Sequence, residues 1–151
     1  MFIPWNEKKR IEQVVRAFFG WQTWTDWTPT VTQDVAVAAT VTEAKYTVIG
    51  KVCHIYARLA ITGAGTGNNP ILISGYPTAV TPAWKDQDAS VGTCMIVDNG
   101  TGLYPGMVTT DGTGANFVLR DANTGAPLGQ APNFALANND SIGFSATYRV
   151  A

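Results

Sequence analysis

The only histidine of the chain, His54, directly follows Cys53, and this pair is the first place to look for nucleophilic chemistry. A thiol becomes an effective nucleophile when a base lies within hydrogen-bond reach of it. Both residues belong to an alternating apolar stretch, residues 51–61, and successive side chains of a strand point to opposite faces. His54 also has no carboxylate near it in the sequence. We therefore expect a surface or interface histidine rather than a catalytic one.

Carboxylates are the next candidates, because glycoside hydrolysis needs a pair of them at a defined separation. Asp26, Asp86, Asp88 and Asp111 are available, but nothing in the sequence pairs them. The stretches DNGTG and DANTG resemble fragments of calcium loops, yet they lack the distal glutamate and the full ligand set of an EF-hand. Asp and Asn beside Gly are typical of tight turns. The sequence thus predicts no catalytic residue, no metal site and no cofactor, and therefore no enzyme.

Tryptophan is the residue type that the chain concentrates in one place. The stretch GWQTWTDWTPT, residues 20–30, contains Trp21, Trp24 and Trp27. In a strand, Trp21 and Trp27 would share one face and Trp24 would oppose them, whereas a polyproline-like segment would line all three on one side. A buried Trp removes about 150–250 Å² from water, so packing or a subunit contact is expected here. Sugar stacking is the alternative, with Trp21, Trp24 and Trp84 as its candidate residues.

An amphipathic helix is expected ahead of the tryptophans, over residues 6–19. Asn6 can cap its start, and Gly20 can supply the left-handed residue that ends it. The apolar stripe of this helix has the spacing i, i+3, i+4, i+7, i+8 and consists of Ile11, Val14, Val15, Phe18 and Phe19. Such a stripe has to be buried, so we assign these five residues, with Trp21, Trp24 and Trp27, to a partner-binding or assembly surface.

Beyond residue 30 the apolar residues follow period two, which is typical of strands. In residues 51–61 the face predicted to point to the core carries Lys51, Cys53, Ile55, Ala57, Leu59 and Ile61. In residues 141–150 it carries Ile142, Phe144, Ala146, Tyr148 and Val150. Further strands are expected near residues 34–42, 71–74, 92–98, 106–110 and 115–120, separated by Gly- and Asn-rich turns. The pattern predicts a mainly β fold: an antiparallel β-sandwich or jelly-roll-like domain over residues 31–151, after a helical and Trp-rich docking segment over residues 1–30.

Composition narrows the range of partners. Charged residues make up 14% of the 151 residues and the net charge is −1, so there is no basic footprint for nucleic acid and no polybasic segment for a membrane surface. No apolar run approaches the roughly 20 residues of a membrane span, and the N-terminus lacks the features of a signal peptide. Cys53 and Cys94 fit neither a zinc pair nor a redox motif, and we expect two buried free thiols in a chain made in a cytoplasm.

Four stretches together resemble the β-rich modules of tailed-bacteriophage virion proteins: WTDWTPTVT, AKYTVIGKVCHIYARLAITGAGTG, ILISGYPTAV and NNDSIGFSATYRV. In those modules a Trp-Thr-Pro opening precedes a Tyr-x-x-x-Gly-Lys strand, a Leu-Pro-like stretch and a closing Tyr strand. The resemblance covers residues 24–150, and SGYP stands where the pattern has Leu-Pro. Such modules occur in tail fibres, appendages and capsid decoration proteins, commonly as homotrimers.

The resemblance implies a non-enzymatic virion protein that is made in the host cytoplasm. A fibre normally carries a long shaft, and no heptad or collagen repeat is present here. We therefore expect a homotrimeric capsid decoration or cement protein. Its helix and Trp-rich segment would dock on the major capsid protein or on a tail or collar component, with no nucleic acid or membrane as partner. The alternative is a tail-fibre or appendage module that binds host glycans as receptor.

Overall fold

The structure, a computed structural model, describes residues 4–11, 23–77 and 89–150. Residues 5–11 are helical, so the helix begins one residue before the expected range of 6–19, and Asn6 lies inside its first turn instead of capping its start. Within the described ranges the structure has ten strands: β1 (Thr25–Asp26), β2 (Thr30–Gln33), β3 (Val35–Val37), β4 (Ala39–Ile49), β5 (Val52–Ile61), β6 (Leu72–Ser74), β7 (Ser90–Asp98), β8 (Gly102–Thr110), β9 (Phe117–Asp121) and β10 (Ser141–Arg149). Neighbouring strands pair antiparallel. The mainly β, antiparallel fold class predicted from the sequence is confirmed.

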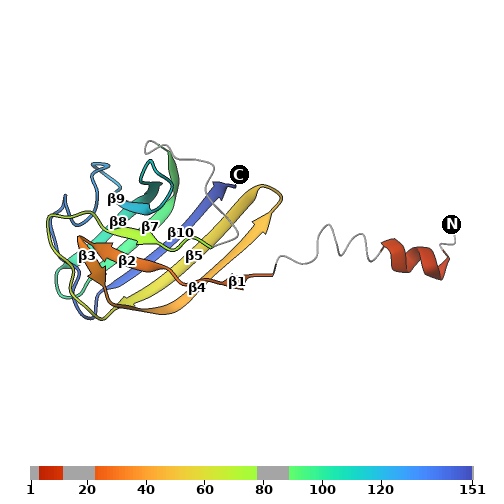
Figure 1. The fold of residues 1–151 in the computed structure, drawn as a ribbon, viewed down its shortest axis with the longest axis horizontal. Helices are drawn as coiled ribbons and strands as arrows, with labels where there is room; N and C mark the ends of the chain where they lie inside the picture. Colours follow the sequence, from red (N-terminus) through yellow and green to blue (C-terminus); the bar gives the residue numbers. More distant parts are fainter. Residues whose placement is uncertain (1–3, 12–22, 78–88, 151) are drawn as a thin grey trace.

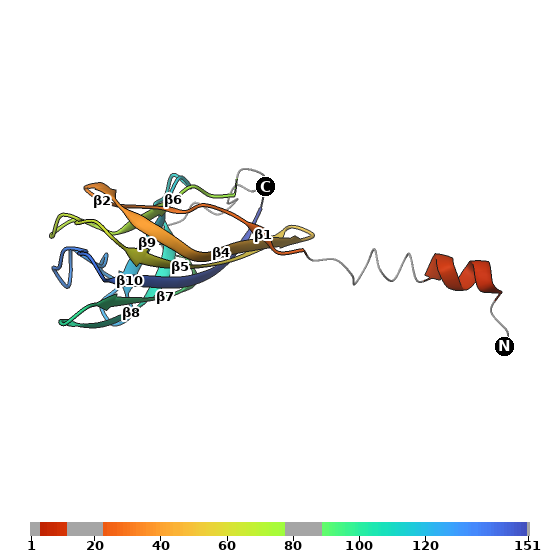
Figure 2. The same ribbon diagram turned by 90° about the horizontal axis from the view of Figure 1, so that it is seen from below.

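All ten strands belong to one sheet, in the order β1-β4-β5-β10-β7-β8-β9-β6-β2-β3. The sheet curls into a half-barrel, so that β2, β6 and β9 lie over β5 and β10 in a sandwich-like arrangement (Figure 1 and Figure 2). Aromatic contacts cross the space between these layers: the ring centroid of Phe117 on β9 lies 6.3 Å from that of Phe144 and 5.7 Å from that of Tyr148, both on β10. The hydrophobic core fills the inside of the curl.

Period two along β5 and β10 determines which side chains enter this core. The inner residues of β5 are at most 2% exposed: Cys53, Ile55, Ala57, Leu59 and Ile61. The inner residues of β10 are buried too: Ile142, Phe144, Ala146 and Tyr148. Val150, just beyond β10, is partly buried against them. The register pairs Tyr148 with Cys53 and Phe144 with Ala57, which places the two inner faces on the same side of the sheet. Both core faces predicted from the sequence are confirmed, except at Lys51, which is exposed in the turn before β5.

The N-terminal part of the sheet differs from the sequence prediction. The strand expected over residues 34–42 is in fact two strands, β3 and β4, separated at Ala38. The carbonyl of Ala38 accepts hydrogen bonds from the amides of Thr62 and Gly63 instead of pairing within a strand. β4 also continues to Ile49. β1 lies in the Trp-rich segment, for which a strand was one of the two geometries considered. β2 arises where no strand was expected, and the predicted boundary between residues 30 and 31 falls inside it. The division into two parts remains a prediction, although Thr25–Asp26 and Thr30, from the first part, belong to the sheet.

One buried glutamine connects β2 to two distant loops. Gln33 is 0% exposed. Its Nε2 donates to the carbonyl of Phe134 at 2.7 Å and to that of Asn69 at 3.3 Å, and its Oε1 accepts from the amide of Leu136 at 2.9 Å. A Cβ added at Gly65 would clash with Gln33 Oε1, so the loop approaches this side chain closely only because residue 65 is glycine. Gln33 thus fixes the loops that close this end of the half-barrel.

Two aspartates organise turns beside β9. Asp121 Oδ1 accepts from the amide and the hydroxyl of Thr124, each at 2.8 Å, and these bonds hold the pKa of Asp121 below its usual value. Burial alone would raise the pKa of Asp111, but hydrogen bonds from Thr113 and Asn116 outweigh it and the pKa is lowered. The stretch DANTG is therefore a turn built around its own carboxylate, as expected from its composition.

The two cysteines lie inside the sheet as free thiols, and this prediction is confirmed. Cys53 is on β5, and Cys94 is on β7 with its Sγ 3.7 Å from the carbonyl oxygen of Met107. Burial raises the pKa of the Cys53 thiol, and it raises the pKa of the Cys94 thiol to about 12. Both groups are therefore protonated at neutral pH, which suits a packing role.

Candidate functional site

The structure describes three of the residues assigned to the assembly surface. Ile11 is in the helix and is 50% exposed, Trp24 lies just before β1 and is 47% exposed, and Trp27 is 7% exposed. The other residues named from the sequence lie outside the described residues: Val14, Val15, Phe18, Phe19, Trp21 and Trp84.

Trp24 and Trp27 point to opposite faces of the sheet, because the chain between them is the strand β1. Trp27 points inward, where its ring meets that of Phe144 edge-on at a centroid distance of 6.2 Å. Its Nε1 also donates to the carbonyl of Tyr56 at 3.5 Å. Trp24 points outward. Of the two geometries considered for this segment, the strand alternation describes Trp24 and Trp27, and Trp27 packs within its own chain.

Around Trp24, the outer face carries a group of aromatic and charged side chains, which we call the Trp24 cluster: Trp24, Asp26, Glu43, Lys45 and Tyr56. The rings of Trp24 and Tyr56 meet edge-on at 5.2 Å and 67°. The Tyr56 hydroxyl donates to Glu43 Oε1 at 2.7 Å, and Lys45 Nζ donates to Asp26 Oδ1 at 2.6 Å. The polar groups of the cluster are thus held in pairs beside the tryptophan ring.

Electrostatics favour the protonated forms of Lys45 and Tyr56. The hydrogen bond and the charge of Asp26 raise the pKa of the Lys45 ammonium. The hydrogen bond to Glu43 raises the pKa of the Tyr56 hydroxyl. The side chain of Asp26 is 85% exposed and that of Lys45 is 33% exposed, so water screens the ion pair and its contribution to folding is small. The cluster is therefore open to solvent and available for contact.

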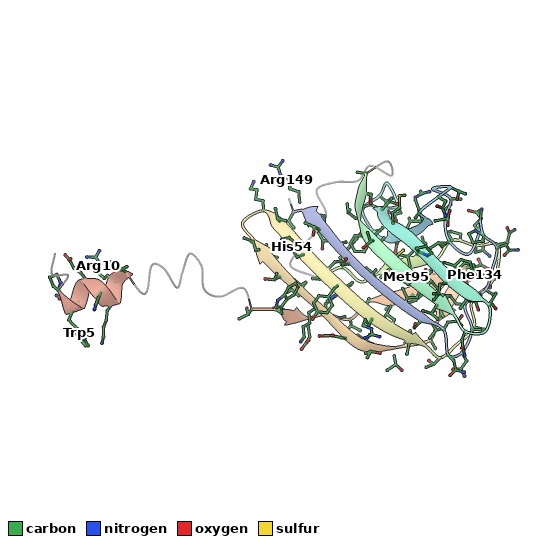
Figure 3. All side chains as sticks on the ribbon, turned by 180° about the vertical axis from the view of Figure 1, so that it is seen from behind. Trp5, Arg10, His54, Met95, Phe134 and Arg149 are labelled. Carbon is green, nitrogen blue, oxygen red and sulfur yellow. The ribbon has the colours of Figure 1, made fainter. Side chains whose placement is uncertain are left out.

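Further along the outer face, on β7 and β8, the side chains become apolar. The antiparallel register places Met95 opposite Pro105 and Val97 opposite Leu103, and we call these four residues the β7–β8 patch. Leu103 is 64% exposed and Met95 is 42% exposed. Figure 3 shows this face, with Met95 on β7 and His54 on β5.

Next to the patch, the surface is hollowed at Gly143 of β10, which lies opposite Met95. A Cβ added at Gly143 would meet nothing within 4 Å. A shallow depression of about 500 Å³ includes Gly143, Ser145, Met95 and Pro105 in its lining. The outer face therefore offers an apolar ridge beside a hollow, a shape into which another surface can fit.

A second cavity, of about 330 Å³, lies where β6 ends and β1 leads into β2. Trp27, Tyr46, Tyr76 and Pro77 are among the residues that line it. The buried hydroxyl of Tyr76 has no hydrogen-bond partner within the described part of the chain, and burial raises its pKa. The pKa of the buried Tyr148 hydroxyl is also raised, first by burial and then by the neighbouring Cys53 thiol. The ring of Tyr76 packs on Phe117 at 4.3 Å, so this tyrosine is part of the core wall as well as of the cavity.

The residues first considered for catalysis lie apart in the structure. Cys53 points into the core, whereas His54 is on the outer face with its Nδ1 2.9 Å from Thr147 Oγ1. In the ranges that the structure describes, no three His, Cys, Asp or Glu side chains gather in a way that could hold a metal ion. Over the same ranges, no helix is long and apolar enough to cross a membrane.

No protein-family model matches this chain, and no match is found to a curated protein or to a solved structure. The proposed function therefore rests on the surfaces described above and on the sequence resemblance.

Proposed function

We propose that this chain is a non-enzymatic structural protein of a bacteriophage virion, which assembles as a homotrimer and decorates the capsid. The virion class and the threefold state come from the sequence resemblance. The structural observation that carries the assembly part is the exposed β7–β8 patch on the outer face of a sheet whose core is already filled from the inside.

The β7–β8 patch exposes large apolar side chains to solvent. Neither Leu103 nor Met95 contributes to the core, and both point away from it on neighbouring strands. Covering apolar surface is worth about 25 cal/mol per Å², so side chains of this size favour association when a matching surface is present. The hollow at Gly143 gives a second copy room to approach the backbone of β10. We assign this patch to the contact between subunits.

The N-terminal helix supports the docking part of the proposal. Trp5 is 72% exposed and Ile11 is 50% exposed, so the helix presents large apolar side chains to its surroundings. Lys9 Nζ lies 3.9 Å from the centroid of the Trp5 ring, which leaves a cation beside the exposed aromatic. A helix with these features can bind a groove on a larger particle, such as the major capsid protein or a tail or collar component.

Light scattering on the purified chain tests the assembly part. The wild-type protein should have the mass of three chains, and the double variant Met95→Lys, Leu103→Lys should have the mass of one chain while its circular dichroism is unchanged. Val35→Lys is the matched control, because Val35 is an exposed apolar residue on β3, away from the patch. A single-chain mass for the wild type at high concentration would refute the proposal. An intact trimer in the double variant would refute the assignment of the patch.

A second candidate function is the receptor-binding module of a tail fibre or appendage that engages host glycans. The exposed ring of Trp24, one of the residues considered for sugar stacking, favours it. Capsid decoration and glycan binding use different surfaces of the chain, so they can be tested separately.

A further inference from the structure

We propose that the Trp24 cluster is a binding site for a neutral saccharide. The sugar ring would stack on Trp24, and its hydroxyl groups would form hydrogen bonds with Asp26, Glu43 and Lys45. One chain supplies the whole cluster, so this inference does not depend on the proposed assembly; it rests on the second candidate function, glycan binding, and names the site and the class of sugar.

The first support is the placement of the tryptophan ring. Trp24 keeps 47% of its surface exposed, although the sheet buries Trp27 only three residues later. The edge contact with Tyr56 at 5.2 Å holds the Trp24 ring on the outer face. The C–H bonds on one face of a sugar ring are attracted to the negative face of an aromatic ring. A ring that is held in place before binding loses little conformational entropy when a ligand stacks on it.

The second support is the set of free polar groups around that ring. Asp26 and Glu43 each use one carboxylate oxygen, Oδ1 and Oε1, and no hydrogen bond among the described residues uses Asp26 Oδ2 or Glu43 Oε2. Lys45 has three N–H donors, and its ion pair with Asp26 uses one of them. Sugar hydroxyls donate and accept, so they need both kinds of partner beside the stacking ring. The cluster supplies both from rigid neighbouring strands.

The third support is the charge of the surrounding face. With Arg58 next along β5, the face carries two carboxylates and two cations, which gives no net attraction for an acidic sugar. The centres of protein interfaces are depleted in charged residues, because burying such groups is costly. A saccharide leaves them in contact with water. The cluster therefore suits a neutral sugar, whereas the uncharged β7–β8 patch suits a second copy.

Saturation-transfer NMR on the full chain tests the site. The probes are the methyl glycosides of glucose, galactose, mannose and N-acetylglucosamine, each at millimolar concentration. At least one of these glycosides should receive saturation from the wild-type protein. Trp24→Ala should raise the Kd for that glycoside tenfold or more. Trp5→Ala is the matched control, because Trp5 is an exposed tryptophan on the helix and should leave binding unchanged. Binding to none of the four probes, or equal binding by Trp24→Ala, would overturn the proposal.

Two further variants test the site even if the Trp24→Ala protein does not fold. Glu43→Gln and Lys45→Met keep the ring and change one exposed and one partly exposed polar group. Each should weaken binding several-fold at an unchanged melting temperature. Wild-type affinity in both would overturn the assigned hydrogen bonds. Light scattering distinguishes a subunit contact: a Trp24→Ala protein that falls apart into single chains would overturn the saccharide site. The double variant of the β7–β8 patch should bind the probe as wild type does, so the two proposals fail independently.

Discussion

Replacing Gln33 by leucine should strongly destabilise the half-barrel, although the change makes the core more apolar. Leucine has a comparable volume but ends one bond earlier and carries no polar atom, so the substitution removes every side-chain hydrogen bond of Gln33. Gln33→Leu would leave the carbonyl of Phe134 and the amide of Leu136 without their partners at 2.7 and 2.9 Å. Leu136 is itself 0% exposed, so water does not readily replace the lost bond.

The size of the effect follows from these two groups. A buried donor or acceptor that loses its partner costs about 1–3 kcal/mol, so the pair costs about 2–6 kcal/mol, and the longer bond to Asn69 adds less. We expect a loss of about 4 kcal/mol in the free energy of unfolding, a large part of the roughly 5–15 kcal/mol of a typical domain.

Urea denaturation followed by circular dichroism measures this loss, with the slope m reporting whether the transition remains comparable. Gln130→Leu is the control, because Gln130 is exposed in a loop near the same end and should change stability by about 0.5 kcal/mol or less. Hydrogen exchange adds a local readout, since the Leu136 amide should exchange faster in the variant. A loss below about 1 kcal/mol at unchanged m would refute the view that these bonds hold the loops in place.

Two other predictions concern ionisable groups. The lowered pKa values of Asp111 and Asp121 mean that the ionised carboxylates stabilise the fold above the unfolded-state value near 3.9, so stability should fall as the pH drops below about 4. Asp121→Asn keeps an acceptor oxygen and should flatten this acid limb in a pH series of thermal melts, and an unchanged limb would argue against the assignment. For the thiols, burial predicts that Cys53 and Cys94 react with a disulfide reagent at pH 8 only after unfolding, and that reductant leaves the melting temperature unchanged. Rapid labelling of the native protein would contradict this.

Local patterns in the sequence were sufficient to predict the core faces of β5 and β10, because period two needs only the residues of one strand. The same pattern placed Tyr56 and His54 on the outer face. It could not place Tyr56 beside Glu43, since that contact depends on the pairing of β4 with β5 and on the irregularity between Val41 and Glu43. β1 has two residues, too few to show any period, and so Asp26 was not linked to Lys45.

Gln33 illustrates the same limit for a buried polar residue. In the stretch VTQD it stands between a threonine and an aspartate, and no local pattern marks it as buried. It is buried because loops that are 101 and 103 residues away in the chain bring a carbonyl and an amide to its side chain. No local pattern encodes such a meeting, although the glycine at residue 65, which leaves room for the side chain, is visible in the sequence.

The position of β10 has a consequence for the synthesis of the protein. β10 is the last of the described strands along the chain, yet it lies near the middle of the sheet, paired with β5 over nine residues and with β7 over six. Until residues 141–149 have left the ribosome, β5 and β7 each present an open edge, and Phe144 and Tyr148 are missing from the core. Open apolar edges are templates for aggregation in a nascent chain. The half-barrel should therefore close only after β10 has been translated. The yield of folded protein should depend on how well β5 and β7 are protected from aggregation until then.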